Sequence, residues 1–216
     1  MINSKKIAII CAMHEEASII IDKLNLKELR EASLVQGQVV TIFENDDLVL
    51  IECSIGKVAA GFATHYVITN FNPEVIINIG VAGAVNQSFN PGDVFFVKKV
   101  FQHDVYVPGD NYQDKFYARI EGEVPEISDV KSVVLATGDQ FIDDITKVEE
   151  LSKKADLVDM EGYAVAYTAE KFNTKTILIK AVSDKADFSA KESFEENLDK
   201  AMNNSVVLLK KVLDLI

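Results

Sequence analysis

At residues 74–79 the sequence reads Glu-Val-Ile-Ile-Asn-Ile, an almost wholly apolar run. A short continuous apolar run of this kind is typical of a β-strand that is buried on both faces, in the centre of a sheet. The preceding residues 57–71 have helical character, with Gly56 before them and Asn72-Pro73 after them as helix boundaries. A helix followed by a fully buried strand predicts an α/β protein whose sheet is covered on both faces.

The same alternation of strands and helices continues in both directions from residues 74–79. Further strands are predicted at residues 7–11, 38–43, 48–53, 94–100, 132–136, near Leu157 and at 176–182, and further helices at 13–24, 142–151, 161–172 and from Ser189 or Ser193 to the end. Both serines precede a glutamate by three residues, as in a capping box. Residues 108–130 are expected to form a long loop. No repeat or linker interrupts the pattern, so we expect one domain over residues 1–216.

The charge of the chain argues against two classes of partner. Its 216 residues include 34 acidic and 22 basic side chains, for a net charge of -12, and only Arg30 and Arg119 are arginines. Such a negative field repels phosphate backbones and anionic lipids, so we expect neither nucleic acid nor a membrane surface as partner.

The cysteines and the amino terminus indicate the compartment. Cys11 and Cys53 form no C-x-x-C pair and have no zinc-ligand spacing with the histidines, so we expect two free buried thiols. The first apolar run is too short for a secretory signal or a membrane span. These features predict a cytoplasmic protein.

Acidic residues follow several of the predicted strands. Ligands of α/β sheets bind beyond the carboxyl ends of the strands, and here the segments at those ends are residues 13–16, 80–83, 138–141, 159–162 and 183–187. Four of the five carry acids, none carries arginine, and none forms a phosphate or dinucleotide loop. Carboxylates serve either hard-cation binding or acid/base chemistry, but a calcium loop gathers its ligands within about a dozen residues. Acids from separate strands therefore favour acid/base chemistry, with glycosidic bond cleavage as the obvious case.

Each of these acids also has a structural interpretation when it is taken alone. Glu16 could be a solvated helix residue, Glu161 a first-turn acid that complements a helix dipole, and Asp184 a turn or N-cap residue. Lys57 and His103 are assigned structural roles.

Seven sequence blocks, in order along nearly the whole chain, carry a resemblance to a known family. They lie at residues 9–16, 54–60, 75–83, 92–94, 137–142, 158–161 and 181–187. On these blocks the chain resembles the bacterial 5′-methylthioadenosine/S-adenosylhomocysteine nucleosidases, within the nucleoside phosphorylase/hydrolase superfamily. The resemblance implies a three-layer α/β/α sandwich with a mixed central sheet, and a homodimer in which the partner subunit completes each pocket. The implied activity is hydrolysis of the N-glycosidic bond of methylthioadenosine, S-adenosylhomocysteine and 5′-deoxyadenosine in methionine salvage, without metal or cofactor.

The resemblance also implies a role for individual residues. Asp184 is expected to protonate adenine N7, Glu16 to activate the attacking water, and Glu161 to hold the ribose hydroxyls. The expected substrate-binding residues are Phe141 and Ile142 at the base, Met160 at the ribose, Phe194 near the 5′ substituent, Ser183 beside Asp184, and Met13, Ile55 and Gly83. An acid that protonates adenine near neutral pH must be buried, so that its pKa is raised.

Two departures from the family leave alternatives open. Val81 stands where the superfamily usually has a small hydroxyl residue, and residues 103–109 form a shorter loop than the one expected to reach the partner's pocket. A phosphorolytic purine nucleoside phosphorylase is one alternative, disfavoured because phosphate sites normally use arginine and hydroxyl groups. A non-catalytic nucleoside-binding protein is another, and a nucleosidase for a different adenine nucleoside, such as aminodeoxyfutalosine, is a third.

Overall fold

The structure is a computed structural model that describes residues 6–29, 32–35, 38–108 and 119–216. The helices are α1 (His14–Leu24), α2 (Lys57–Phe71), α4 (Ile145–Leu151), α5 (Gly162–Lys171) and α6 (Ala190–Leu213). The strands are β1 (Ile7–Cys11), β2 (Lys27–Glu28), β3 (Ala32–Val35), β4 (Gln38–Val40), β5 (Ile42–Glu44), β6 (Leu48–Glu52), β7 (Val75–Ala84), β8 (Val94–Gln102), β9 (Ile120–Glu121), β10 (Ser132–Thr137), β11 (Leu157–Asp159) and β12 (Lys175–Asp184).

One mixed sheet organises the chain, in the strand order β11-β10-β8-β12-β7-β1-β6-β5-β2. Strand β7 is central and runs parallel to both β1 and β12. Its far end also pairs antiparallel with β11, at Val158 opposite Gly83 and Leu157 opposite Ala84. The sheet is therefore curled, because the edge strand β11 also pairs with the central strand β7. This pairing brings the carboxyl ends of β7, β11 and β12 together.

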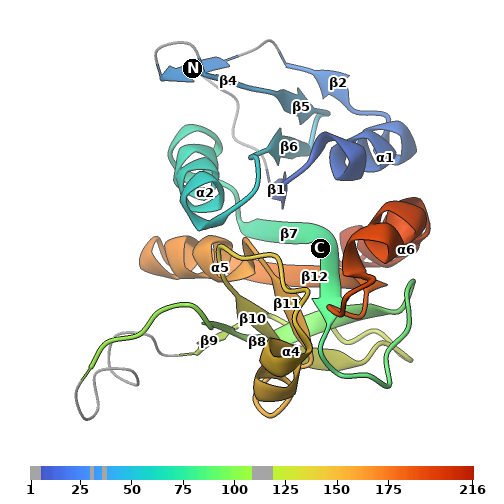
Figure 1. Cartoon of the computed structure of the whole chain (residues 1–216). Helices are drawn as coiled ribbons and strands as arrows, with labels where there is room; N and C mark the ends of the chain where they lie inside the picture. The colour runs from blue at the N-terminus through green and yellow to red at the C-terminus, as the bar shows by residue number, and fades with distance from the viewer. Residues whose placement is uncertain (1–5, 30–31, 36–37, 109–118) are drawn as a thin grey trace.

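Helices cover both faces of the sheet, which gives the three-layer α/β/α sandwich expected from the sequence (Figure 1). Helices α1 and α6 pack together on one face and α2 and α5 on the other. The buried apolar side chains of β1 alternate between the two layers, with Ile7 and Ile9 facing α1 and α6 and Ala8 and Ile10 facing α2 and α5. Burial on both faces explains why the central strands read as continuous apolar runs.

The structure corrects several boundaries. Residues 80–83 and 183–184, expected beyond the strand ends, lie within β7 and β12, because those strands continue to pair with each other. Residues 38–43 are divided between β4, which pairs with β3 in a separate small sheet, and β5 of the main sheet. The expected loop at 108–130 contains β9, and its residues 109–118 lie outside the described residues, as does the last residue of the shortened 103–109 loop.

Helix α6 has Ser189, one of the two predicted start positions, as its N-cap residue, but it lacks the predicted capping box. Helix α6 begins after Ser189, but the Ser189 hydroxyl donates to Asp187 Oδ1 (2.7 Å) and does not cap the helix. The expected capping box is therefore wrong, because Asp187 upstream of the helix competes for the hydroxyl. Cys11 and Cys53 are free and buried, as predicted.

Candidate active site

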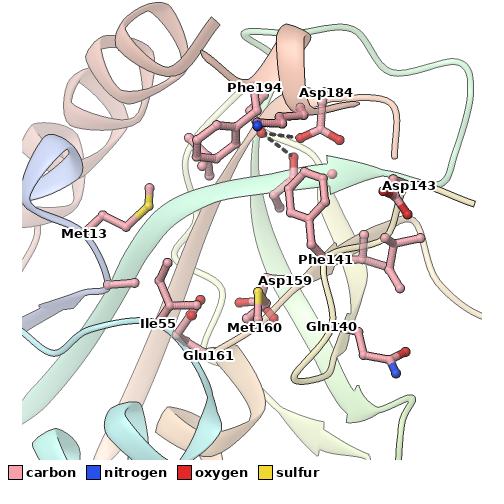
Figure 2. A pocket seen from close by; sticks show the side chains of 18 of the residues that line it. Met13, Ile55, Gln140, Phe141, Asp143, Asp159, Met160, Glu161, Asp184 and Phe194 are labelled. Atoms are coloured by element: carbon pink, nitrogen blue, oxygen red, sulfur yellow. Dashed lines mark hydrogen bonds between the residues drawn. The ribbon is translucent and has the colours of Figure 1, made fainter. Parts of the chain in front are cut away.

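A cavity of about 400 Å³ lies at the carboxyl ends of the central strands (Figure 2). The structure brings all the site residues predicted from the sequence to its wall: Met13, Glu16, Ile55, Gly83, Phe141, Ile142, Met160, Glu161, Ser183, Asp184 and Phe194. The other lining residues had no predicted role, although Val81 was noted as a departure from the family: Ala12, Val81, Ala82, Gln140, Asp143, Val158, Asp159, Lys191 and Glu195. A concave site of this size with few polar groups suits a small molecule.

Glu16 is buried at the start of α1, 3% exposed, and is not a solvated helix residue. Its Oε2 accepts hydrogen bonds from the backbone N–H groups of Ala12 (3.1 Å) and Met13 (3.2 Å). Its Oε1 accepts one from the N–H of Val81 (2.9 Å). A Cβ at Gly80 would lie 2.7 Å from Oε1, so glycine leaves room for this carboxyl group. Burial raises the pKa of Glu16, although these hydrogen bonds oppose the shift.

Asp184 is the last residue of β12 and is also 3% exposed. Its Oδ2 accepts a hydrogen bond from the Ser183 hydroxyl (2.7 Å), and its Oδ1 accepts one from the N–H of Ala186 (2.8 Å). Burial raises the pKa of Asp184 despite these two bonds. Asp184 is not an N-cap, because α6 begins only at Ala190.

Glu161 occupies the N-cap position of α5, but its side chain makes no capping bond. Instead its Oε1 accepts a hydrogen bond from the N–H of Gly56, 105 residues away (2.8 Å). Burial and the nearby carboxylate of Asp159 raise the pKa of Glu161 to about 7. The carboxyl group lines the cavity, and its ionisation there lowers the stability of the fold.

We expect Glu161→Gln to stabilise the fold in a pH-dependent way. In the unfolded chain a glutamate has a pKa of ~4.3, whereas the pKa of folded Glu161 is about 7. Between these two pH values the unfolded chain is increasingly ionised while folded Glu161 keeps its proton, so the fold loses stability as the pH rises. The neutral amide removes that cost, so the free energy of unfolding should rise by on the order of 2 kcal/mol at pH 8 and not at pH 4. Urea unfolding at both pH values measures this difference.

Glu195→Gln is the matched control, because Glu195 lines the same cavity but is exposed. It should change stability little at either pH. An equal effect of Glu161→Gln at pH 4 and pH 8 would contradict the raised pKa.

Lys180, which sequence reasoning missed, lies buried beneath the cavity at 1% exposure. Its Nζ donates to Asp159 Oδ2 (2.8 Å), and Asp159 Oδ1 accepts from the Thr137 hydroxyl (2.6 Å). Lys180 is the register partner of Gly80 in β7, and Gly80 lies against Glu16. Burial alone lowers the pKa of Lys180, but the carboxylates of Asp159, Glu161 and Glu16 raise it above its ordinary value. The ammonium group therefore offsets part of the negative charge at the floor of the site.

Apolar side chains form the remaining walls of the cavity (Figure 2). The rings of Phe141 and Phe194 meet edge to face, with centroids 6.3 Å apart and planes at 85°. Phe141 is 48% exposed and so is not a core residue, whereas Ile142 is buried. Ile55 is also exposed, and Met13 and Met160 are partly buried. This mixture of aromatic and flexible apolar groups suits a flat ring with an apolar substituent.

The described residues provide neither an arginine at the cavity nor a cluster of metal ligands. No described lining residue is an arginine; Arg119 stacks on the Phe101 ring at 5.0 Å, and Arg30 lies outside the described residues. Within the described ranges, no group of three or more His, Cys, Asp or Glu side chains is arranged to hold a metal ion.

Among the helices that the structure describes, none is both long and apolar enough to cross a membrane.

Comparison with known proteins decides the family. Residues 6–214 match the phosphorylase superfamily. A 5′-methylthioadenosine/S-adenosylhomocysteine nucleosidase of Bacillus licheniformis is 31% identical, over 96% of this chain and 98% of the relative, and one of Staphylococcus aureus is 34% identical, over 92% and 95%. The chain belongs to this nucleosidase family. The resemblance predicted from the sequence blocks is thereby confirmed.

Solved structures agree with this assignment to the nucleosidase family. The Helicobacter pylori 5′-methylthioadenosine/S-adenosylhomocysteine nucleosidase with butyl-thio-DADMe-Immucillin-A has a TM-score of 0.84 and is 27% identical, over 99% of both chains. A futalosine hydrolase of the same species has a TM-score of 0.85 and is 26% identical, over 98% of both chains. The shared fold therefore accommodates nucleosidases that are named for different substrates.

Proposed function

We propose that this protein hydrolyses the N-glycosidic bond of 5′-methylthioadenosine, S-adenosylhomocysteine and 5′-deoxyadenosine, releasing adenine and the 5-substituted ribose. The observation that carries the proposal is the convergence of three buried carboxyl groups, on Glu16, Glu161 and Asp184, at one cavity of a nucleosidase-family chain.

Asp184 is the proposed general acid. Adenine is a poor leaving group as an anion, so N7 must receive a proton as the glycosidic bond breaks. Burial raises the pKa of Asp184 and so helps it to keep its proton, while Ser183 and Ala186 hold its two oxygens. The proton passes from the Asp184 carboxyl group to N7 as the C1′–N9 bond breaks, which leaves Asp184 ionised and adenine neutral. Water then adds to C1′ and gives one proton to the base, Glu16. Proton exchange with solvent returns Asp184 to its acid form and Glu16 to its carboxylate before the next turnover.

Glu16 is the proposed base for the attacking water. Bond cleavage leaves the ribose with much of a positive charge, and water adds readily to such a centre when a carboxylate accepts its proton. Although Val81 has no hydroxyl group, its backbone N–H holds Glu16 Oε1, which supports an oriented carboxylate without a hydroxyl at this position. Lys180 offsets the buried charge from below.

Glu161, Met160 and the aromatic residues are proposed to hold the nucleoside. The carboxylate of Glu161 accepts bonds from the ribose hydroxyls and favours the developing cation by its charge. Phe141 stacks on adenine, the backbone of Ile142 contacts the base edge, and Met160 lies against the ribose. Phe194, Met13 and Ile55 surround the 5′ substituent, and Gly83 leaves space beside Asp184, since a Cβ there would lie 3.0 Å from Oδ1.

Hydrolysis is favoured over phosphorolysis by the charges of the cavity. Phosphate needs concentrated positive charge and hydroxyl donors. Among the described residues that line the cavity, Lys191 is the one lysine, it is exposed, and there is no arginine. Val81 has no hydroxyl group.

A second copy of the chain is proposed to complete the pocket and form a homodimer, which the family resemblance implies. Exposed apolar side chains lie on the loop before α2, on α2 and on α5. Ile55 lines the cavity itself, and Val58, Phe62 and Tyr167 line a second surface hollow together. Apolar patches of this kind commonly mark protein interfaces. The remaining proposals are one domain over residues 1–216 and a cytoplasmic location, for which the free buried thiols give support. Nucleic acid and membranes are not proposed as partners, because the net charge is -12.

Chromatography of the free base tests the proposal with a panel of nucleosides. We expect adenine release from methylthioadenosine, S-adenosylhomocysteine and 5′-deoxyadenosine, and no hypoxanthine release from inosine. Aminodeoxyfutalosine belongs in the panel because the solved futalosine hydrolase shares the fold. Cleavage of that compound alone would replace the proposed substrates, and binding without cleavage of any compound would support the non-catalytic alternative.

A further inference from the structure

Lys57 makes an ion pair outside the cavity that the proposed chemistry does not use. It is the first residue of α2, and its Nζ donates to Asp104 Oδ1 (2.6 Å) and to Gln102 Oε1 (3.0 Å). The side chains of Lys57 and Asp104 are only 15% and 16% exposed. Although partial burial opposes it, the hydrogen bonds from Lys57 and from the N–H of Asp139 hold the pKa of Asp104 below its usual value. The pair is thus screened less than an exposed ion pair.

The same pair ties three separate segments of the chain together. The N–H of Lys57 donates to Asp139 Oδ1 (2.8 Å), and the N–H of Asp139 donates to Asp104 Oδ2 (2.8 Å). Next to this cluster the N–H of His103 donates to the carbonyl of Thr137 (3.0 Å). The start of α2, the end of β8 and the loop after β10 are therefore joined by a closed set of hydrogen bonds.

Two of these segments carry the walls of the cavity. Ile55 and Gly56 directly precede Lys57, and the N–H of Gly56 donates to Glu161 Oε1 (2.8 Å). Phe141 follows Asp139 by two residues and lines the cavity. Figure 2 shows Ile55 and Phe141 on different sides of the same space. The ion pair thus braces, from outside, the side of the cavity that holds Glu161 and the side that carries Phe141.

We propose that Lys57 is a positioning residue for the nucleosidase reaction, one that sets the spacing between the ribose-binding and base-binding walls through Asp104 and Asp139. The inference rests on the proposed function, because that function assigns Glu161 to the ribose and Phe141 to the base. A residue that only stabilised the fold would affect unfolding but not the binding of nucleoside to folded protein. Lys57 does not line the cavity, so in this role it acts on the substrate indirectly, through the loop before α2 and the loop after β10.

Steady-state kinetics on methylthioadenosine tests the proposal with matched variants. Lys57→Met should lower kcat/KM about 100-fold, as expected for a displacement on the order of 1 Å in a binding wall, with KM raised about tenfold. Lys57→Arg keeps the cation and should lose less than about tenfold. Because Lys57 and Asp104 act as a unit, the double variant Lys57→Met/Asp104→Asn should lose no more than Lys57→Met alone.

Lys99→Met is the control, because Lys99 makes an exposed ion pair with Glu121 (3.2 Å) away from the cavity. It should stay within about twofold of the parent protein. Thermal unfolding of every variant establishes that the assays are performed on folded protein. Equal losses in Lys57→Met and Lys57→Arg, or a Lys57→Met variant that behaves like Lys99→Met, would overturn the positioning role.

Ligand binding separates this inference from the proposed function. If the parent protein binds adenine and methylthioadenosine but cleaves neither, the proposed hydrolysis fails, and the Kd values of the same variants by calorimetry still test Lys57. A tenfold weaker Kd in Lys57→Met, recovered in part by Lys57→Arg, supports the positioning role in that case. If the parent protein neither cleaves nor binds these compounds, both proposals fall.

Discussion

Asp184→Asn is expected to lose about 10³-fold in kcat on methylthioadenosine, within the range attributed to general acid catalysis. Asparagine has nearly the same shape, and its amide oxygen can still accept the hydrogen bond that Ala186 N–H donates to Oδ1, so the loop after β12 should keep its structure. It cannot give a proton to adenine N7. Binding of methylthioadenosine, measured by calorimetry, should therefore change only a few-fold while turnover collapses.

Two controls sharpen this result. Asp187→Asn changes a partly buried aspartate three residues along the chain, which accepts hydrogen bonds from Ser189, and should retain activity. A p-nitrophenyl 5-methylthioriboside has a leaving group that departs as an anion without protonation, so Asp184→Asn should cleave it with a much smaller loss. Cleavage of methylthioadenosine by Asp184→Asn at the normal rate would show that another group supplies the proton.

Lys180→Met is expected to lose about 3–5 kcal/mol of stability, the effect of removing one member of a buried ion pair. Asp159 keeps its hydrogen bond from Thr137 and one from the N–H of Gly162 (2.8 Å), but it loses the buried ammonium group that lies beside its charge. Glu161 and Glu16 lose the same compensating charge. Urea unfolding at neutral pH measures the loss as a shift of the midpoint.

The pair to compare is Lys99→Met, whose exposed ion pair with Glu121 should contribute less than about 1 kcal/mol. The double variant Lys180→Met/Asp159→Asn removes the uncompensated charge and should recover part of the stability. If Lys180→Met costs no more than Lys99→Met, the buried ammonium does not compensate the carboxylates of the site.

The elements that local chemistry determines were predictable from the sequence. Helix α2 matches its predicted range, 57–71, because Gly56 precedes it and Asn72 ends it in the left-handed conformation, at φ 49°. Strand β7 was predicted too short, since the glycine and alanine residues of 80–84 carry no strand signal. They are extended because β12 and β11 pair with them, and this pairing depends on residues about 75–100 positions away.

Some residues of the site were also predictable from the sequence, and others were not. Six of the seven sequence blocks end or follow a buried strand, and they contain every predicted site residue at the cavity except Phe194. The seventh block, 92–94, precedes β8 and does not line the cavity. Lys180 was missed although a lysine inside an apolar strand must find a partner. That partner, Asp159, comes from β11 and is brought close only by the curl of the sheet. The network of Lys57, Asp104 and Asp139 was missed for the same reason, since its members are 35 to 82 residues apart.

The identity of the sugar product distinguishes hydrolysis from phosphorolysis. The purified protein is incubated with methylthioadenosine, once without phosphate and once with saturating phosphate, and the products are separated by mass. We expect adenine and free 5-methylthioribose at equal rates in both reactions. Adenine release that depends on phosphate, with 5-methylthioribose 1-phosphate as the product, would contradict hydrolysis and make the protein a phosphorylase.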